Sequence, residues 1–124
     1  MKAIALVTLF ALATVPVQAH ERRLCKGNPN LVGQCFKIHG RIYIANGAPA
    51  IRIWRVGTSR ILGVSPPEDE NIPADLDRTF KDNSPFTKYY GDFEVCPFTR
   101  EKPKAMQIVC VESATHILSG KDSK

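Results

Sequence analysis

The sequence predicts an all-β fold, a single antiparallel β-sandwich of about seven strands that carries two disulfides. Short segments in which apolar and polar residues alternate recur along the chain, and turn residues separate them. No helical period of apolar residues extends over more than a few turns. The four cysteines are an even number in a chain that begins like an exported protein. These observations are typical of a small exported β-sandwich.

The N-terminus has the pattern of a signal peptide over residues 1–19, cleaved after Ala19. Lys2 supplies the positive start, an uncharged apolar run follows, and Pro16 precedes the small residues that signal peptidase accepts. The apolar run is shorter than the roughly 20 residues that a transmembrane helix needs. We therefore expect a β-sandwich domain over 20–118, a flexible tail over 119–124, no transmembrane segment, and a periplasmic or secreted location.

Three strands are expected to follow one another in a meander. They span residues 35–45, 50–56 and 60–64. In the first strand Phe36 and Ile38 share one face, while Lys37 and His39 share the other, as expected of a half-buried strand. The pair Asn46-Gly47 and the pair Gly57-Thr58 mark the turns.

A long connection over residues 65–89 interrupts the strand pattern. It contains four prolines and half of the acidic residues, and connections of this length are usually functional or mobile. Pro73 followed by Asp75 and Asp77 predicts one or two helical turns over residues 73–80, because proline and acidic residues suit the first turn.

The last two strands are expected to form a hairpin that holds two of the four cysteines. These strands span residues 90–98 and 105–113. Counting alone leaves three disulfide pairings open. Placing Cys96 opposite Cys110 also sets the neighbouring valines opposite each other, so this register favours the pairs Cys96–Cys110 and, by elimination, Cys25–Cys35. No Cys-x-x-Cys spacing is present, which argues against a structural zinc site.

The segment over residues 40–54 reads G-R-I-Y-I-A-N-G-A-P-A-I-R-I-W. A strand that opens with glycine, followed by Asn-Gly-x-Pro and an alternating apolar strand, resembles the first hairpin of carboxypeptidase-regulatory-like, transthyretin-like β-sandwich domains. The resemblance implies a seven-strand sandwich that serves as a non-catalytic accessory or binding domain, and it assigns no functional residue. The chain as a whole also resembles small exported proteins of Gram-negative bacteria.

Arginine and aromatic residues on two neighbouring strands form the candidate ligand-binding set. Its members are Arg41, Tyr43, Arg52, Trp54, Arg55 and Arg60. An indole beside guanidinium groups can stack on sugars and bind anions through paired hydrogen bonds. Residues 20–63 carry eight basic side chains against one acid, whereas residues 64–94 carry eight acids against three basic side chains.

This charge segregation leaves two interpretations of the arginines open. In the first, the 65–89 connection covers Trp54, and Glu68, Asp69 and Glu70 neutralise the arginines. In the second, the arginines and Trp54 form an open ligand surface. The first is favoured because a single exposed tryptophan is uncommon in a stable monomer. Strict alternation also fails at Arg55, which predicts a bulge or a strand end there.

A copper-binding protein is the alternative to a protein that acts through this ligand-binding surface. His20 becomes the first residue after cleavage, and an N-terminal histidine can bind Cu(II) through its amine and its ring. The other ligands could only be His39 and His116. Lys37 and Arg41 flank His39 and would repel a cation, so no metal or other cofactor is the first expectation.

Catalysis is the third hypothesis. It ranks behind binding and copper because the sequence shows no nucleophile elbow, P-loop or dinucleotide-binding motif. Whether the protein is an enzyme therefore stays open, and a non-catalytic role is favoured. The sequence predicts an exported binding or accessory protein whose partner is an anionic envelope glycan or another exported protein. Nucleic acid is not an expected partner in that compartment.

Overall fold

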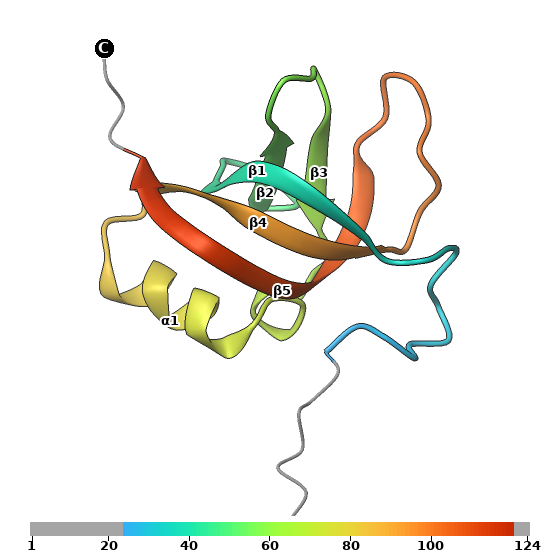
Figure 1. Cartoon of the computed structure of the whole chain (residues 1–124), viewed down its shortest axis with the longest axis horizontal. Coiled ribbons are helices and arrows are strands. Elements are labelled where there is room, and N and C mark those ends of the chain that lie inside the picture. Colours follow the sequence, from blue (N-terminus) through green and yellow to red (C-terminus); the bar gives the residue numbers. More distant parts are fainter. Residues whose placement is uncertain (1–23, 121–124) are drawn as a thin grey trace, which may run out of the picture.

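The computed structural model describes residues 24–120, which form a closed barrel of five strands (Figure 1). The strands are β1 (Phe36–Ile44), β2 (Ile51–Arg55), β3 (Ile61–Val64), β4 (Lys88–Pro97) and β5 (Gln107–Gly120). A short 3-10 helix, η1 (Glu68–Glu70), and the helix α1 (Ala74–Asp82) connect β3 to β4. The expected signal peptide, His20 and residues 121–124 of the expected tail lie outside the described residues.

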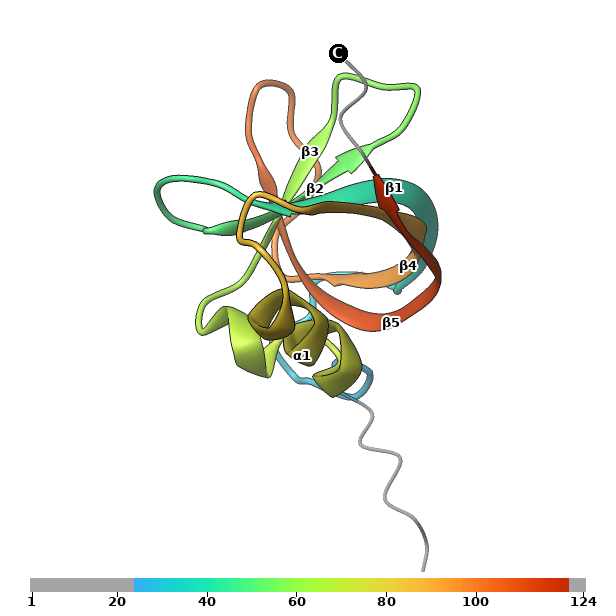
Figure 2. The same cartoon turned by 90° about the vertical axis from the view of Figure 1, so that its left-hand side faces the viewer.

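The strands follow each other around the barrel in the order β1-β2-β3-β5-β4, and β4 pairs with β1 to close it (Figure 2). All neighbouring strands are antiparallel except β3 and β5, which are parallel. A Greek-key barrel of five strands with a helix between the third and fourth has the topology of the OB fold.

The predicted seven-strand sandwich is therefore wrong, and so is the sandwich fold that the transthyretin-like resemblance implies. Sandwiches and barrels both bury alternate residues of every strand, so the alternation of apolar residues does not distinguish them. The pairing of strand edges decides between them. Strand β1 pairs with β2 over Gly40–Ile44 and with β4 over Phe36–Ile42, while β3 and β5 join the remaining edges.

The individual elements agree with the sequence better than the architecture does. Each of the five expected strands is confirmed, although β5 continues to Gly120 and so includes two residues assigned to the tail. The hairpin register is also confirmed, with Cys96 opposite Cys110 in the β4–β5 pair. Gly47 has a φ of 96°, a left-handed conformation that suits the predicted Asn-Gly turn.

The helix α1 confirms the expected helical turns and contributes to the core at one end of the barrel (Figure 2). Pro73 precedes its first turn, and Lys81 in the last turn forms an ion pair with Asp77 at 2.7 Å. Leu76 and Phe80, one turn apart, are buried with the inward-facing residues of the strands. The β2–β3 and β4–β5 loops project from the opposite end of the barrel (Figures 1 and 2).

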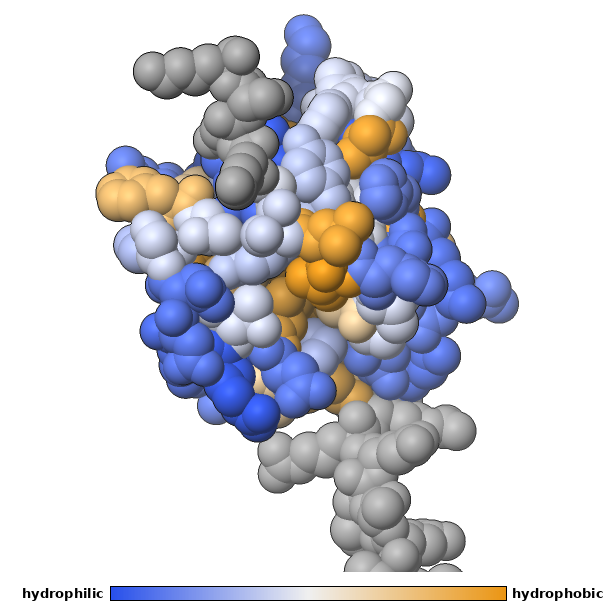
Figure 3. Space-filling model, turned by 60° about the vertical axis from the view of Figure 1, so that its left-hand side comes forward, coloured by the Kyte–Doolittle hydropathy of each residue, from blue (hydrophilic) through white to orange (hydrophobic). Residues whose placement is uncertain are grey.

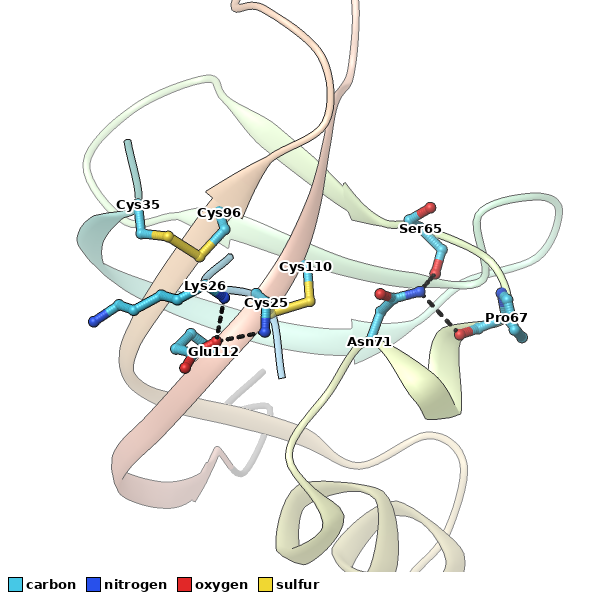
Figure 4. The surroundings of a disulfide bond; sticks show 9 residues. All are labelled: Cys25, Lys26, Cys35, Ser65, Pro67, Asn71, Cys96, Cys110 and Glu112. Atoms are coloured by element: carbon cyan, nitrogen blue, oxygen red, sulfur yellow. Dashed lines mark hydrogen bonds between the residues drawn. A yellow bond between two sulfur atoms is a disulfide. The ribbon is translucent and has the colours of Figure 1, made fainter. Parts of the chain in front are cut away.

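The disulfides are two in number, as predicted, but they join Cys25 to Cys110 and Cys35 to Cys96. The predicted pairs Cys25–Cys35 and Cys96–Cys110 are therefore wrong. Opposed cysteines on paired strands satisfy the geometry of a disulfide poorly. The segment before β1 instead crosses the β4–β5 hairpin and supplies a partner for each of its cysteines (Figure 4).

Two polar residues, Glu112 and Asn71, tie the connecting segments to this hairpin (Figure 4). The carboxylate of Glu112 accepts hydrogen bonds from the backbone N–H groups of Cys25 at 2.6 Å and Lys26 at 3.1 Å. The side-chain amide of Asn71 donates to the carbonyl oxygens of Ser65 and Pro67, while the backbone carbonyl oxygen of Asn71 accepts from Val111 N–H. The connection over residues 65–89 is thus tied to β5 before α1 begins.

The surface is mostly polar on the face shown in Figure 3, where hydrophobic residues gather in a small central patch. Among the described residues two large apolar side chains are strongly exposed, Phe86 at 87% and Leu118 at 70%. Single exposed apolar residues are common in monomeric proteins.

Between residues 24 and 120 no helix has the length and apolar character that crossing a membrane requires. The two disulfides are typical of a protein outside the cytoplasm.

Candidate functional site

The structure brings four of the six candidate binding residues together on the outer face of β1 and β2. Arg41 lies directly opposite Trp54, and Tyr43 lies directly opposite Arg52. Their neighbours Ile42 and Ile53 point into the barrel and are fully buried. Because successive residues of a strand point to opposite faces, burial of the isoleucines places all four polar and aromatic side chains outside.

Arg41 is the centre of this group. Its guanidinium carbon lies 5.0 Å from the centroid of the Trp54 ring and 5.6 Å from the centroid of the Tyr43 ring, within the range of cation–π attraction. Its Nε is shielded from solvent and has no hydrogen-bond partner among the described residues. Two aromatic rings therefore lie against this charge, and between residues 24 and 120 no carboxylate forms an ion pair with it.

The other members of the set are fixed by backbone carbonyl groups or lie at the ends of strands. Arg52 donates to the carbonyl oxygens of Asn46 and Pro49 in the β1–β2 loop. The indole Nε1 of Trp54 donates to the carbonyl oxygen of Thr58 at 2.7 Å, which fixes the ring against the β2–β3 turn. Arg55 is exposed where β2 ends, and this confirms the strand end predicted there.

The expected neutralisation of the arginines by Glu68, Asp69 and Glu70 is not observed within residues 24–120. The side-chain carboxylate of Glu68 accepts a hydrogen bond from the backbone N–H of Ala50. The acidic segment therefore contacts the backbone of the β1–β2 loop and not an arginine side chain. Arg60 forms its ion pair with Glu101 of the β4–β5 loop at 3.2 Å.

A groove extends this basic surface beyond β2. It has a volume of about 350 Å³ and lies between the start of β3 and the β4–β5 loop. Its lining residues are Ser59, Arg60, Ile61, Lys104, Ala105 and Met106. Ile61 is the residue opposite Trp54 in the β2–β3 pair, so the groove begins beside the tryptophan. Lys104 supplies one more positive charge there, and Arg60 supplies a second that is already paired with Glu101.

A second constellation lies on the outer face of the neighbouring strands. His39 on β1 and His116 on β5 both contact Asp92 on β4, with each Nδ1 lying 3.0 Å from a different oxygen of the carboxylate. The structure thus joins two of the three histidines of the predicted copper site, and the third, His20, lies outside the described residues. A pocket of about 450 Å³ opens here.

These contacts lower the pKa of the Asp92 carboxyl group. The hydrogen bond with His39 lowers the pKa of Asp92 below its ordinary value of 3.8, and the bond with His116 acts in the same direction. A depressed pKa in the folded state means that this contact stabilises the protein above the unfolded pKa of about 3.9. The stabilisation is lost as the pH falls through the lower folded value.

We expect a carbon-detected NMR titration of Asp92 to give a midpoint below 3.8. His39→Ala is expected to raise that midpoint, because it removes the contact with the largest effect on the Asp92 pKa. His116→Asn is expected to raise it by less. An Asp92 midpoint at or above 3.8 in the unsubstituted protein would contradict this interpretation.

Sequence reasoning missed Asp92 and the groove residues Lys104 and Met106. Asp92 is opposite His39 only because β4 pairs with β1, and no local pattern indicates that pairing. Its alternation with buried Phe93 was the one available signal that it faces outward.

One further group of potential metal ligands lies near the disulfides. Cys25, Cys96 and Glu112 place one potential ligand atom each within 4.8 Å of the others. Both cysteines are oxidised in disulfides, and a metal binds the free thiolate, so this group is structural in the present state.

The arrangement on β1 and β2 suits an anionic ligand with a flat or ring-shaped component, and the arrangement around Asp92 offers imidazole and carboxylate groups in an open pocket.

Comparisons of this chain with protein-family models, with curated proteins and with solved structures gave no match.

Proposed function

We propose that this protein is an exported, non-catalytic binding protein whose ligand is an anionic glycan of the cell envelope. One observation carries the proposal: the Arg41 guanidinium lies on an outer face between two aromatic rings, without a carboxylate partner in the described residues. Arg41 is half-buried, and arginine side chains bind carboxylate or phosphate through paired hydrogen bonds of their guanidinium N–H groups.

The neighbouring groups fit a sugar polymer. Tyr43 and Trp54 are half-buried and present apolar ring surface beside a positive charge, which suits a sugar ring that carries an acidic substituent. The groove beside Trp54 continues the surface to Arg60 and Lys104, so a ligand longer than one sugar has further cations to contact. OB-fold barrels bind oligosaccharides and oligonucleotides on the face of their second and third strands, which shares only β2 with this surface, and a shared topology alone does not assign a ligand.

Location supports a glycan over nucleic acid. The two disulfides are typical of a non-cytoplasmic protein. The signal-peptide pattern predicts delivery to the periplasm or the extracellular space, where envelope polymers are abundant. Another exported protein is the alternative partner, since an arginine–aromatic surface is also common at protein interfaces.

Trp54 is the only tryptophan, so its fluorescence reports directly on this surface. We expect soluble peptidoglycan strands or delipidated lipopolysaccharide carbohydrate to change the emission, and uncharged maltohexaose to leave it unchanged. Arg41→Gln is expected to weaken binding of the anionic glycan at least about 10-fold, because one charge-assisted hydrogen-bonding group is lost. Added salt should weaken the binding of the unsubstituted protein.

Arg78→Gln is the matched control, since it removes one arginine from the exposed face of α1. It is expected to bind like the unsubstituted protein. An equal loss in both variants would show that net charge and not the Arg41 site governs binding. Binding to an envelope extract that disappears after protease treatment, with no response to any glycan, would favour the exported-protein partner instead.

A further inference from the structure

The groove beside Trp54 combines apolar and polar side chains. Its volume of about 350 Å³ is at the lower end of the range for small-molecule sites. Three of the lining residues are apolar and three are polar: Ile61, Ala105 and Met106, and Ser59, Arg60 and Lys104. Ile61 is 37% exposed, although isoleucine is among the residue types most often buried. The groove therefore suits a small ligand group that has both an apolar and a polar part.

The groove and the Arg41 site belong to one row of side chains across three strands. Arg41 lies opposite Trp54 in the β1–β2 pair, and Trp54 lies opposite Ile61 in the β2–β3 pair. Directly opposed residues of paired strands share a face, so all three side chains project outward. Two strand spacings separate the backbones of Arg41 and Ile61, a distance of about 10 Å. A ligand that lies over Trp54 therefore reaches Arg41 on one side and the groove on the other.

A missing side chain on β3 makes room for Met106, which lines the groove beside Ile61. Gly63 lies opposite Arg52 and so faces outward, two residues after Ile61. A Cβ on Gly63 would lie 2.6 Å from Sδ of Met106 and would also overlap the ring of Pro49. The thioether thus occupies the space over Gly63. Methionine is flexible and polarizable, so its side chain adapts to an apolar ligand group.

The polar lining residues differ in how far they are already engaged. Arg60 forms its ion pair with Glu101 and also donates to the backbone carbonyl oxygen of Lys102 at 3.1 Å. Lys104, in contrast, has no ion-pair partner in the part of the chain that the structure describes. Its φ of 63° is a left-handed conformation that non-glycine residues seldom adopt and that is frequent at ligand sites. The Lys104 ammonium and the Ser59 hydroxyl are the groups that can donate hydrogen bonds to a ligand in the groove.

We propose that this groove holds the N-acetyl group of an amino sugar, so that the ligand is an acidic glycan built from N-acetylated amino sugars. The acetyl methyl contacts Ile61 and Met106, and the amide oxygen accepts a hydrogen bond from Lys104. A long acyl chain is a poorer occupant, because it would take water from the polar half of the lining without replacing its hydrogen bonds. This assignment depends on the proposed function, since Arg41 binds the acidic substituent of the same glycan.

The test compares one oligosaccharide with derivatives that differ only in the acyl group. The probe is the peptide-free tetrasaccharide of alternating N-acetylglucosamine and N-acetylmuramic acid, which carries carboxylates and N-acetyl groups. In the derivatives N-formyl or N-propionyl replaces N-acetyl. Calorimetry is expected to show about 4-fold tighter binding of the N-acetyl than of the N-formyl form, because one more methyl group is buried. The N-propionyl form should bind at least as tightly as the N-acetyl form.

Substitutions in the groove should remove this preference without abolishing binding. Ile61→Thr keeps a β-branched residue on the strand surface, and Met106→Gln keeps an unbranched side chain. Each is expected to reduce the ratio of N-acetyl to N-formyl affinity to about 1. Ile44→Thr is the matched control, since Ile44 is exposed to nearly the same extent, 38%, but lies outside the groove at the end of β1. Arg41→Gln should weaken binding of all three forms by one factor and leave the ratio unchanged.

The outcomes separate the acetyl subsite from the proposed function. Equal binding of the N-formyl and N-acetyl forms, or a preference that survives both Ile61→Thr and Met106→Gln, overturns the subsite and leaves the anionic-glycan proposal standing. The same holds if the tetrasaccharide is not bound but delipidated lipopolysaccharide carbohydrate is. If neither carbohydrate is bound, both proposals are wrong.

Discussion

Removal of either disulfide is expected to lower the free energy of unfolding by about 4 kcal/mol. The cross-links join residues that are 85 and 61 positions apart, and long loops lose the most chain entropy when they are closed. A small single domain has about 5–15 kcal/mol of stability in total, so one missing disulfide removes much of it. Denaturant unfolding of Cys25→Ala/Cys110→Ala and of Cys35→Ala/Cys96→Ala measures both losses.

The pairing itself is tested by choosing which cysteines are removed together. Cys25→Ala/Cys110→Ala takes out one bridge and should leave no free thiol. Cys25→Ala/Cys35→Ala breaks both bridges, so it should be the less stable protein, and its two remaining cysteines lose their partners. If the first variant released two thiols and the second none, the bridges would instead follow the sequence-based pairing.

Peptide mapping gives an independent test of the bridges. Trypsin cleaves after Lys26, Lys37, Arg100 and Lys104, so each cysteine falls in a different peptide. Without reduction, the peptide that contains Cys25 should be linked to the one that ends at Lys121, in which Cys110 lies.

Gly40→Ala is expected to destabilise the barrel by about 2 to 3 kcal/mol. Gly40 lies on the inward face of β1, where this strand is paired with β2 and β4 at once. A Cβ at this position would lie 2.6 Å from Cγ2 of Ile53 and 3.1 Å from the carbonyl oxygen of Trp54. Ile53 is fully buried, so neither neighbour can move away without disturbing the core.

Gly33→Ala is the matched control for this substitution. A Cβ there would meet only the Pro97 side chain, at 3.6 Å, an ordinary contact. Its expected effect is near zero or slightly stabilising, because alanine restricts the unfolded chain more than glycine does. Thermal unfolding of the two variants measures the difference, and a Gly40→Ala protein as stable as Gly33→Ala would refute the close packing of β1 over β2.

The binding set shows which parts of a site the sequence can predict. Alternation placed Arg41, Tyr43, Arg52 and Trp54 on outward faces, and the Asn-Gly turn made β1 and β2 neighbours, so the structure confirms that they share one surface. The ion-pair partners predicted for the arginines were wrong. Charge counts over segments predicted pairing with the acidic connection, but an ion pair needs proximity, and that connection turns toward β5 through Asn71.

The sequence by itself determined the local elements: five strands, the helix near Pro73, the Asn-Gly turn, and the register of the β4–β5 hairpin. These follow from side-chain periodicity and turn chemistry, which act between residues close in the chain. Only the tertiary structure decided that the strands close into a barrel, that Cys25 and Cys35 cross to the far hairpin, and that Asp92 meets two histidines. Each of these depends on contacts between residues distant in the sequence, and their free energy depends on packing of the whole chain and not on any local pattern.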